Sequence, residues 1–221
     1  ALDNLKLKRA AVLYDVASEY NKGIAEIFRD VYEKRGGKVV AFETYTTNDR
    51  DFTSQFTKIK KANPDLIFLP NYYSEVPLQI QQAKRLGLNV PFIGSDSWGS
   101  EDLLKLCGAD CEGYYFSTHY AADSARESTQ KFLAAYKAKY GKTPDDVAAL
   151  TYDSFGLLFQ ALKNARTNDR RALRDALSKI PRYEGVTGVM QFQEGSGDPI
   201  KSAVILKIQN GKFEWFANAT P

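Results

Sequence analysis

Short apolar runs alternate with amphipathic stretches through the first 118 residues, and this alternation limits the fold more than any other feature. Roughly 25–30 residues make up each unit, which is enough for one strand and one crossover helix. The predicted strands are 9–14, 38–43, 66–69, 90–93 and 113–117. The predicted helices are 20–35, a helix carrying Phe52, Phe56 and Ile59, 74–86 and 101–106. Because strands joined by such crossovers lie parallel, this part predicts an α/β fold with an open parallel sheet and flanking helices.

The residues after 120 follow a different pattern. Three helical stretches follow one another without an intervening strand, at 124–140, 144–165 and 170–178. Strand patterns return at 188–192, 203–208 and 213–216. Asn210-Gly211 separates the last two strands, and both residue types tolerate positive φ, so a β-hairpin is predicted there.

Composition and charge exclude several classes of protein. The 221 residues are 43% apolar and 26% charged, which argues against wholesale disorder. The formal net charge of +3 is small and its charges are interspersed, so no nucleic acid partner is predicted. No apolar run approaches the ~20 residues of a spanning helix, so no direct membrane insertion is predicted.

Motifs for catalysis, metal or cofactor binding are weak or absent in the sequence. Gly141-Lys142-Thr143 resembles the end of a phosphate-binding loop, but Tyr136 stands where that motif needs glycine. The single histidine, His119, has no cluster of other ligands at metal-binding spacing. No G-x-S-x-G elbow is present. We therefore expect no enzyme activity, no metal and no cofactor.

The two cysteines, Cys107 and Cys111, are four positions apart. Four residues of helix or compact loop can bring the two Cα atoms within the ~4.4–6.8 Å that a disulfide requires. An even count at close spacing favours a disulfide formed in an oxidising compartment. The alternative is a pair of reduced, partly buried thiols.

Polar and aromatic residues follow the first, third and fourth predicted strands. Ligands of open parallel sheets bind at the carboxyl ends of the strands, where such residues converge. Aromatic walls together with a carboxylate suit a small ligand with an ammonium group, through cation–π contact and a charge-assisted hydrogen bond. The alternative is that these residues only form turns and helix caps. The residues at the three strand ends are Asp15, Ser18, Tyr20, Asn71, Tyr72, Tyr73, Ser95, Asp96, Ser97 and Trp98.

A series of short motifs runs in order along essentially the whole chain. The motifs are Tyr14-Asp15, Glu19-Tyr20-Asn-Lys-Gly23, Gly37-Lys-Val-Val, Asp51-Phe52, Asn63-Pro-Asp65-Leu-Ile, Tyr72-Tyr73, Ala83-Lys-Arg-Leu-Gly87, Glu112-Gly113, Tyr152-Asp153, Gly185-Val-Thr-Gly188 and Phe192. This series resembles the branched-chain amino acid-binding proteins. That family comprises type I periplasmic solute-binding proteins, which feed ABC importers.

The resemblance implies a two-lobed protein that closes on an amino acid. The family uses a tyrosine after the first strand, a tyrosine after the third and an acid after the fourth, which correspond here to Tyr20, Tyr72 and Asp96. The acid would accept the ligand's α-ammonium group, and relatives carry glutamate where this chain has the shorter Asp96. Together with the strand-end pattern, this predicts the ligand-binding residues Ser18, Tyr20, Tyr72, Asp96 and Trp98.

The resemblance also implies that the chain lacks the N-terminal βαβ lobe of its longer relatives. Residues 8–119 would form the second, flavodoxin-like ligand-binding lobe, 120–184 a helical segment of the first lobe, and 185–221 the hinge return and C-terminal strands. A hinge is expected near 117–121 and 183–188. The apolar side chains that the orphan helices would expose, promoting self-association, are Phe132, Ala135, Leu150, Leu157 and Leu158.

The predicted function is the substrate-binding component of an ABC importer, with a small amino acid as ligand and the transporter permease as partner. The resemblance implies an exported protein, periplasmic or extracellular, whose full-length form can carry a lipid anchor. One alternative is a ligand-sensing domain of a receptor or regulator with the same fold. Another is an enzyme of flavodoxin-like architecture.

Overall fold

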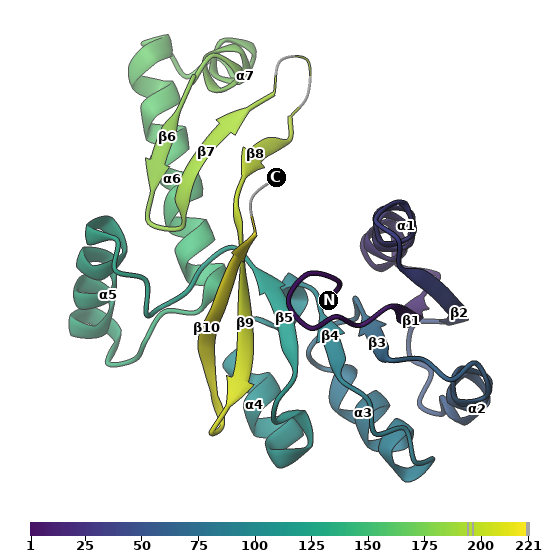
Figure 1. Ribbon diagram of the computed structural model, residues 1–221. Helices are drawn as coiled ribbons and strands as arrows, with labels where there is room; N and C mark the ends of the chain where they lie inside the picture. Colours follow the sequence, from purple (N-terminus) through teal and green to yellow (C-terminus); the bar gives the residue numbers. More distant parts are fainter. Residues whose placement is uncertain (194, 196, 220–221) are drawn as a thin grey trace. The chain divides into compact units, whose positions relative to one another are not determined.

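The structure is a computed structural model that describes residues 1–193, 195 and 197–219 (Figure 1). The chain divides into two compact units. Unit 1 comprises residues 1–117 and 207–213, and unit 2 comprises residues 118–206 and the chain from Glu214 onward. The change in sequence pattern near residue 120 thus lies close to the point where the chain first passes from one unit to the other.

Unit 1 holds the alternating elements. Its strands are β1 (Arg9–Asp15), β2 (Lys38–Tyr45), β3 (Leu66–Leu69), β4 (Phe92–Gly94) and β5 (Tyr115–Thr118), whose last residue passes into unit 2. Its helices are α1 (Glu19–Lys34), α2 (Thr53–Lys61), α3 (Val76–Arg85) and α4 (Glu101–Cys107), with the 3₁₀ turns η1 (Asp96–Trp98) and η2 (Gly108–Cys111). These five strands pair in parallel. They belong to a sheet of order β10-β9-β5-β4-β3-β1-β2, which also contains β9 (Ala203–Gln209) and β10 (Lys212–Ala219). The predicted α/β class, with a mostly parallel sheet and flanking helices, is confirmed.

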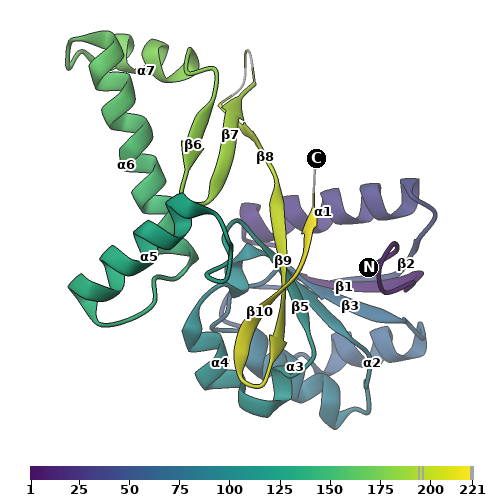
Figure 2. The same ribbon diagram turned by 60° about the vertical axis from the view of Figure 1, so that its left-hand side comes forward.

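The two faces of this sheet carry different helices. Figure 2 shows α1 on one face and α2, α3 and α4 on the other. Right-handed crossovers produce this division, because the strand order reverses between β1 and β3. The strand β3 lies in the interior of the sheet, between β4 and β1, and is buried at all four positions, as its unbroken apolar run predicts.

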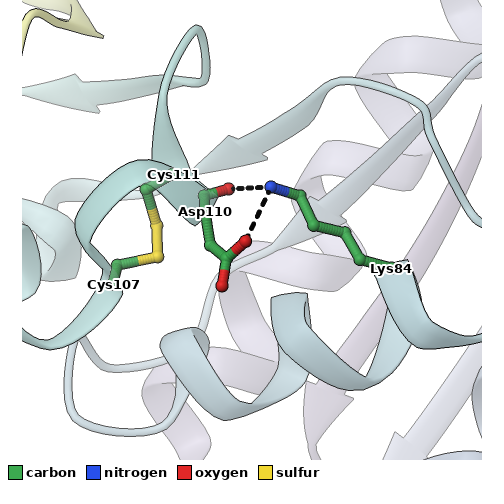
Figure 3. The surroundings of a disulfide bond; sticks show 4 residues. All are labelled: Lys84, Cys107, Asp110 and Cys111. Carbon is green, nitrogen blue, oxygen red and sulfur yellow. Dashed lines mark hydrogen bonds and ion pairs between the residues drawn. A yellow bond between two sulfur atoms is a disulfide. The ribbon is translucent and has the colours of Figure 1, made fainter.

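A disulfide joins Cys107 at the end of α4 to Cys111 at the end of η2, with the Cα atoms 5.6 Å apart (Figure 3). The predicted disulfide is confirmed over the alternative of two thiols. Figure 3 also shows that the Lys84 ammonium group reaches the same turn from α3. It donates to the Asp110 carbonyl oxygen at 2.6 Å and to Asp110 Oδ1 at 3.2 Å. The turn is thereby tied both within itself and to α3.

The predicted hairpin at Asn210-Gly211 is confirmed. It connects β9 (Ala203–Gln209) and β10 (Lys212–Ala219), and its two residues have φ of 55° and 68°. The Glu112 carboxylate accepts from Asn210 N at 2.6 Å and from Gly211 N at 3.3 Å. A residue next to the disulfide therefore holds a turn that comes 98 positions later in the chain.

Unit 2 contains the three predicted helices and a small antiparallel sheet. The helices are α5 (Glu127–Tyr140), α6 (Asp146–Ala165) and α7 (Arg170–Ser178). The sheet has the order β6-β7-β8, formed by β6 (Tyr183–Gly185), β7 (Gly188–Phe192) and β8 (Pro199–Lys201). Only β7 is predicted from the sequence, because three-residue strands such as β6 and β8 are too short to show alternation.

A buried carboxylate on α6 holds the turn between β6 and β7. Asp153 Oδ1 accepts from Val186 N at 2.7 Å, and Oδ2 accepts from Thr187 N at 2.9 Å and from Thr187 Oγ1 at 2.6 Å. A Cβ atom at Gly185 would lie 2.3 Å from Asp153 Oδ2, so only glycine allows the strand to approach the helix this closely. The charge is buried and satisfied by three donors.

The predicted exposed apolar stripe of the helices is wrong in part. Phe132 is buried with Val186, and Leu157 is buried with Ile180 and Met190. The small sheet and the residues around it cover these side chains, and most of that sheet was not predicted. Ala135 and Leu158 are exposed as expected, and Leu150 is half-buried. The exposed apolar face of α6 consists of Val147, Tyr152, Phe155, Leu158 and Phe159.

Candidate functional site

The candidate site lies at the carboxyl ends of β1, β3 and β4, three neighbouring parallel strands of unit 1. The strand order reverses between β1 and β3, so the connections that follow these two strands run in opposite directions. A crevice for ligands forms at such a switch point in open α/β sheets. We call the loops after these three strands the rim.

Ser18 begins α1 and sets the position of Tyr20. Its hydroxyl accepts a hydrogen bond from Asn21 N at 3.3 Å, which is the usual role of an N-cap serine. Ser18 therefore lies at the rim, half-buried, with its hydroxyl engaged by the helix. Tyr20 stands two residues later, in the first turn of the helix.

Tyr20 and Asp96 meet across the rim. The Tyr20 hydroxyl forms a short hydrogen bond to Asp96 Oδ1 and lies 3.2 Å from Ser95 Oγ. Burial and the neighbouring Asp96 carboxylate raise the pKa of Tyr20 to about 12. The phenol therefore stays protonated at neutral pH and donates its proton to the carboxylate. Both residues are only half-buried, so a small molecule can reach them.

Tyr72 completes the aromatic part of the rim. Its ring stacks on that of Tyr20, with 5.6 Å between the centroids and 23° between the planes. Tyr72 is 44% exposed, so its ring is accessible to a small molecule. The structure thus brings Tyr20, Tyr72 and Asp96 together, from three different loops.

Trp98 does not line the rim. It is fully buried, and its indole N–H donates to the Leu69 carbonyl oxygen at 3.1 Å. The ring lies against Gly94, where a Cβ atom would come within 2.1 Å of the indole. The turn η1 directs Trp98 back under the sheet edge, where it packs near Phe116. The glycine four residues before the tryptophan is the sequence signal for this packing.

Asp15 also serves the structure of the rim. It is buried, its Oδ1 accepts from Ala17 N at 2.8 Å, and its Oδ2 forms a short hydrogen bond with the Thr47 hydroxyl. It ties the loop after β1 to the loop after β2. Asp96, which is half-buried, is the more accessible of the two carboxylates.

Two serines of the rim have clearer roles in the structure than in the sequence. Ser95 Oγ lies 2.9 Å from Ser97 Oγ, and Ser97 Oγ donates to the Asn71 carbonyl oxygen at 2.7 Å. A hydroxyl on each side of Asp96 thus takes part in the hydrogen bonding of the loop. The Ser-Asp-Ser sequence directly after a strand was the available signal.

Metal and membrane chemistry find no support in the described part of the chain. Residues 1–193, 195 and 197–219 contain no group of three or more His, Cys, Asp or Glu side chains that could hold a metal ion. Over the same residues, the helices are too short or too polar to span a bilayer. What the rim can do chemically is bind, with a carboxylate, hydroxyls and two stacked phenol rings.

Known proteins resemble this chain over its whole length. The family model described as "Periplasmic binding protein" matches residues 1–212. The leucine-, isoleucine-, valine-, threonine- and alanine-binding protein of Pseudomonas aeruginosa is 28% identical over 219 residues, covering 99% of this chain and 56% of that protein.

Two solved structures share the fold at higher identity. A leucine-binding protein of Thermotoga maritima matches with a TM-score of 0.94 and 32% identity, over 100% of this chain and 63% of that one. The branched-chain amino acid transporter substrate-binding protein of Streptococcus pneumoniae, solved with isoleucine, matches with a TM-score of 0.85 and 33% identity, over 100% and 62%. The chain therefore spans somewhat more than half the length of the proteins it resembles.

Proposed function

Because the chain belongs to the periplasmic binding protein family, we propose that it forms part of the ligand-binding component of an ABC importer. The observation that carries the proposal is the meeting of Tyr20, Tyr72 and Asp96 at the strand-order reversal of the sheet. The proposed ligand is an amino acid, and the proposed action is capture without chemical change. The neighbours named for leucine and isoleucine support an aliphatic side chain.

The ammonium group of the ligand would bind to Asp96. A carboxylate can accept several hydrogen bonds at once, so Asp96 can accept from an ammonium group while it accepts from the Tyr20 hydroxyl. The stacked rings of Tyr20 and Tyr72 present apolar faces and negative π density beside that position. A charge-assisted hydrogen bond and a cation–π contact would then act on the same group.

We propose that residues 8–119 form one ligand-binding lobe and residues 120–184 part of another. The exposed apolar face of α6 would pack against sequence present in the longer relatives. Ligand contacts made by both lobes only in a closed form would drive closure, and a permease would bind that form. The Cys107–Cys111 disulfide supports an oxidising location such as the periplasm.

The test compares L-leucine with N-acetyl-L-leucine in thermal-shift measurements on the chain. Leucine should raise the melting temperature in a concentration-dependent manner, because a ligand that binds only the folded state stabilises it. N-acetyl-L-leucine lacks the ammonium charge and should have no effect. Equal shifts by both compounds, or by neither at high millimolar concentration, would contradict an ammonium site on this chain.

Asp96→Asn adds the residue-level test. It keeps the shape of the side chain but removes the charge, and one charged hydrogen bond is worth roughly 1.5–3 kcal/mol, or roughly 10–100-fold in affinity. Asp30→Asn is the matched control, since Asp30 is an exposed aspartate on α1. The leucine-induced shift should disappear in the first variant and persist in the second. If Asp96→Asn responded to leucine like the parent, the assigned ammonium position would be wrong.

A further inference from the structure

Three amide side chains are completely buried beneath the rim. Asn21 on α1, Asn71 after β3 and Gln79 on α3 are each 0% exposed. Burying an amide is costly unless its hydrogen bonds are made inside the protein. The hydrogen-bond partners of these amides therefore indicate which segments the amides hold in place.

Asn71 is the centre of the group. Its Nδ2 donates to the Leu13 carbonyl oxygen at 3.0 Å and to Gln79 Oε1 at 2.8 Å, and its Oδ1 accepts from Asn21 Nδ2 at 3.4 Å. Its own carbonyl oxygen accepts from Ser97 Oγ at 2.7 Å. The orientation of the amide is fixed, because the Leu13 carbonyl oxygen can only accept and must face the NH₂ group.

Two of these bonds reach a residue next to a candidate binding residue, and Asn71 itself stands next to a third. Asn21 directly follows Tyr20, Asn71 directly precedes Tyr72, and Ser97 directly follows Asp96. Leu13 lies two residues before the end of β1, so its bond fixes the Asn71 loop against the strand itself. One buried residue thus connects the three rim loops, although 50 to 58 positions separate Asn21 and Leu13 from it in sequence.

An apolar residue could fill the same volume without these connections. The group also leaves Asn21 Oδ1 buried without a hydrogen-bond partner among the described residues, which costs stability, so stability alone does not explain these buried amides. A binding site, however, needs its side chains held within ~0.5 Å of the productive geometry by groups behind them. Hydrogen bonds have a defined length and direction, which apolar packing lacks.

We propose that Asn71 is a positioning residue for ligand recognition, which sets the relative placement of Tyr20, Tyr72 and Asp96 through hydrogen bonds to their loops. The inference rests on the proposed function for the roles of those three residues. Asn71 itself does not touch the ligand. It acts by keeping the two phenol rings stacked and the carboxylate loop in register before any ligand arrives.

The test is made on the ligand-free chain by NMR with ring-labelled tyrosine, using Tyr20→Phe and Tyr72→Phe to assign the signals. The stacked rings should give an inter-ring Tyr20–Tyr72 NOE cross-peak in the parent. Asn71→Leu has similar size and no side-chain hydrogen bonds, but keeps the backbone carbonyl oxygen that accepts from Ser97 Oγ. It should lose this cross-peak at a temperature where the chain is folded. Thr129→Val is the matched control, because it removes one buried hydrogen bond to the Val186 carbonyl oxygen in unit 2.

Loss of the cross-peak in Asn71→Leu together with its retention in Thr129→Val would support the proposal. An unchanged cross-peak in a folded Asn71→Leu chain would overturn it and leave Asn71 a purely structural residue. If Asn71→Leu does not fold, Asn21→Leu removes only the bond on the Tyr20 side and should weaken the same cross-peak, whereas an unchanged intensity would overturn the proposal. Because no ligand is present, the result is independent of whether leucine binds, which the thermal-shift experiment decides.

Discussion

A helix of each unit differs in how much of its apolar surface is buried. In unit 1, α3 buries Val76, Ile80 and Ala83 and has no large apolar side chain among the exposed ones. In unit 2, α6 buries Leu157 and Ala161 on one side and exposes Val147, Tyr152, Phe155, Leu158 and Phe159 on the other. Unit 1 covers the apolar side chains of α3 with a sheet of its own, although α1 exposes Ile27 and Val31, and it leaves polar groups at its rim. Unit 2 has only a small sheet for a 20-residue helix, so a second apolar face stays in water.

The different exposure of apolar side chains indicates what kind of partner each unit can bind. The exposed chemistry of unit 1 is specific: a carboxylate and two stacked phenols held by buried hydrogen bonds. The exposed chemistry of unit 2 is apolar and extended along a helix, which suits a permanent packing partner better than a small dissociating ligand. The two tryptophans allow the units to be followed separately, since Trp98 lies in unit 1 and Trp215 in unit 2.

The largest effect is expected from Asp153→Ala. The change removes three hydrogen bonds to the β6–β7 turn and leaves two buried backbone N–H groups without a partner. Each such group costs about 1–3 kcal/mol, so unit 2 should lose roughly 3 kcal/mol or more. The measurement is urea unfolding followed by tryptophan fluorescence in two backgrounds. With both tryptophans present the signal reports both units, and Asp153→Ala should shift part of the transition to lower urea. In a Trp215→Phe background only Trp98 of unit 1 reports, and Asp153→Ala should leave that transition unchanged.

The exposed Asp175→Ala on α7 serves as the control and should leave both transitions unchanged. An equal shift of both transitions in Asp153→Ala would mean that the units unfold as one body. The two units would then differ in their exposed surfaces but would share one free energy of unfolding.

A smaller difference between the units is expected at high pH. Burial is the main cause that raises the pKa of Tyr20, Tyr32 and Tyr114 in unit 1 to about 12, and it raises the pKa of Tyr45 further. In unit 2 the pKa of Tyr120 is raised to about 12 and that of Tyr183 is raised as well.

The sign follows from proton binding in the two states. Between pH 10 and 12 the unfolded chain loses phenolic protons that the folded chain keeps, so stability present below pH 10 falls as the pH rises. Unit 1 should lose more stability than unit 2, as measured by the same two fluorescence transitions. Tyr114→Phe should reduce the loss in unit 1. A steeper loss in unit 2 would contradict the assignment of these buried phenols.

The smallest effect on folding is expected from the double variant Phe155→Gln, Phe159→Gln. Both side chains are exposed, Phe159 to 63%, so the free energy of unfolding should change by no more than about 0.5 kcal/mol. Self-association measured by sedimentation velocity should decrease, because the apolar face of α6 is interrupted. The double variant Ile27→Gln, Val31→Gln makes the matched change on α1 of unit 1 and should leave association unchanged. A parent chain that stays monomeric at high concentration would contradict the role given to the α6 face.

The fold could be predicted where one short stretch of sequence decides the outcome. The run 66–69 is typical of a strand covered on both faces, and Asn210-Gly211 is typical of a tight turn; both predictions are confirmed. The strands β6 and β8 were missed because three residues have no period, and their place depends on Asp153, more than 30 positions from the turn it holds. The exposed face of α6 was misassigned for the same reason, since an unpredicted sheet decides which side of the helix is covered.

The sequence predicted where the accessible residues of the candidate site lie, but not the buried residues that hold them in place. The positions of Tyr20, Tyr72 and Asp96 follow from their places after parallel strands. Trp98 follows the same rule in sequence, yet the space left by Gly94 turns it inward. The contacts of Asn71 with Asn21 and Leu13 span 50 and 58 positions, and no local pattern distinguishes it from an ordinary loop asparagine.

The hold of Glu112 on the Asn210-Gly211 turn has a consequence for the order of events during synthesis. Residues 207–213 belong to unit 1 but leave the ribosome after all of residues 118–206. The edge of β5 that pairs with β9 therefore stays unpaired while the greater part of unit 2 is translated. The Glu112 carboxylate can bind the Asn210-Gly211 turn only at the end of that interval. The last part of unit 1 to be synthesised therefore completes the sheet that the first part began.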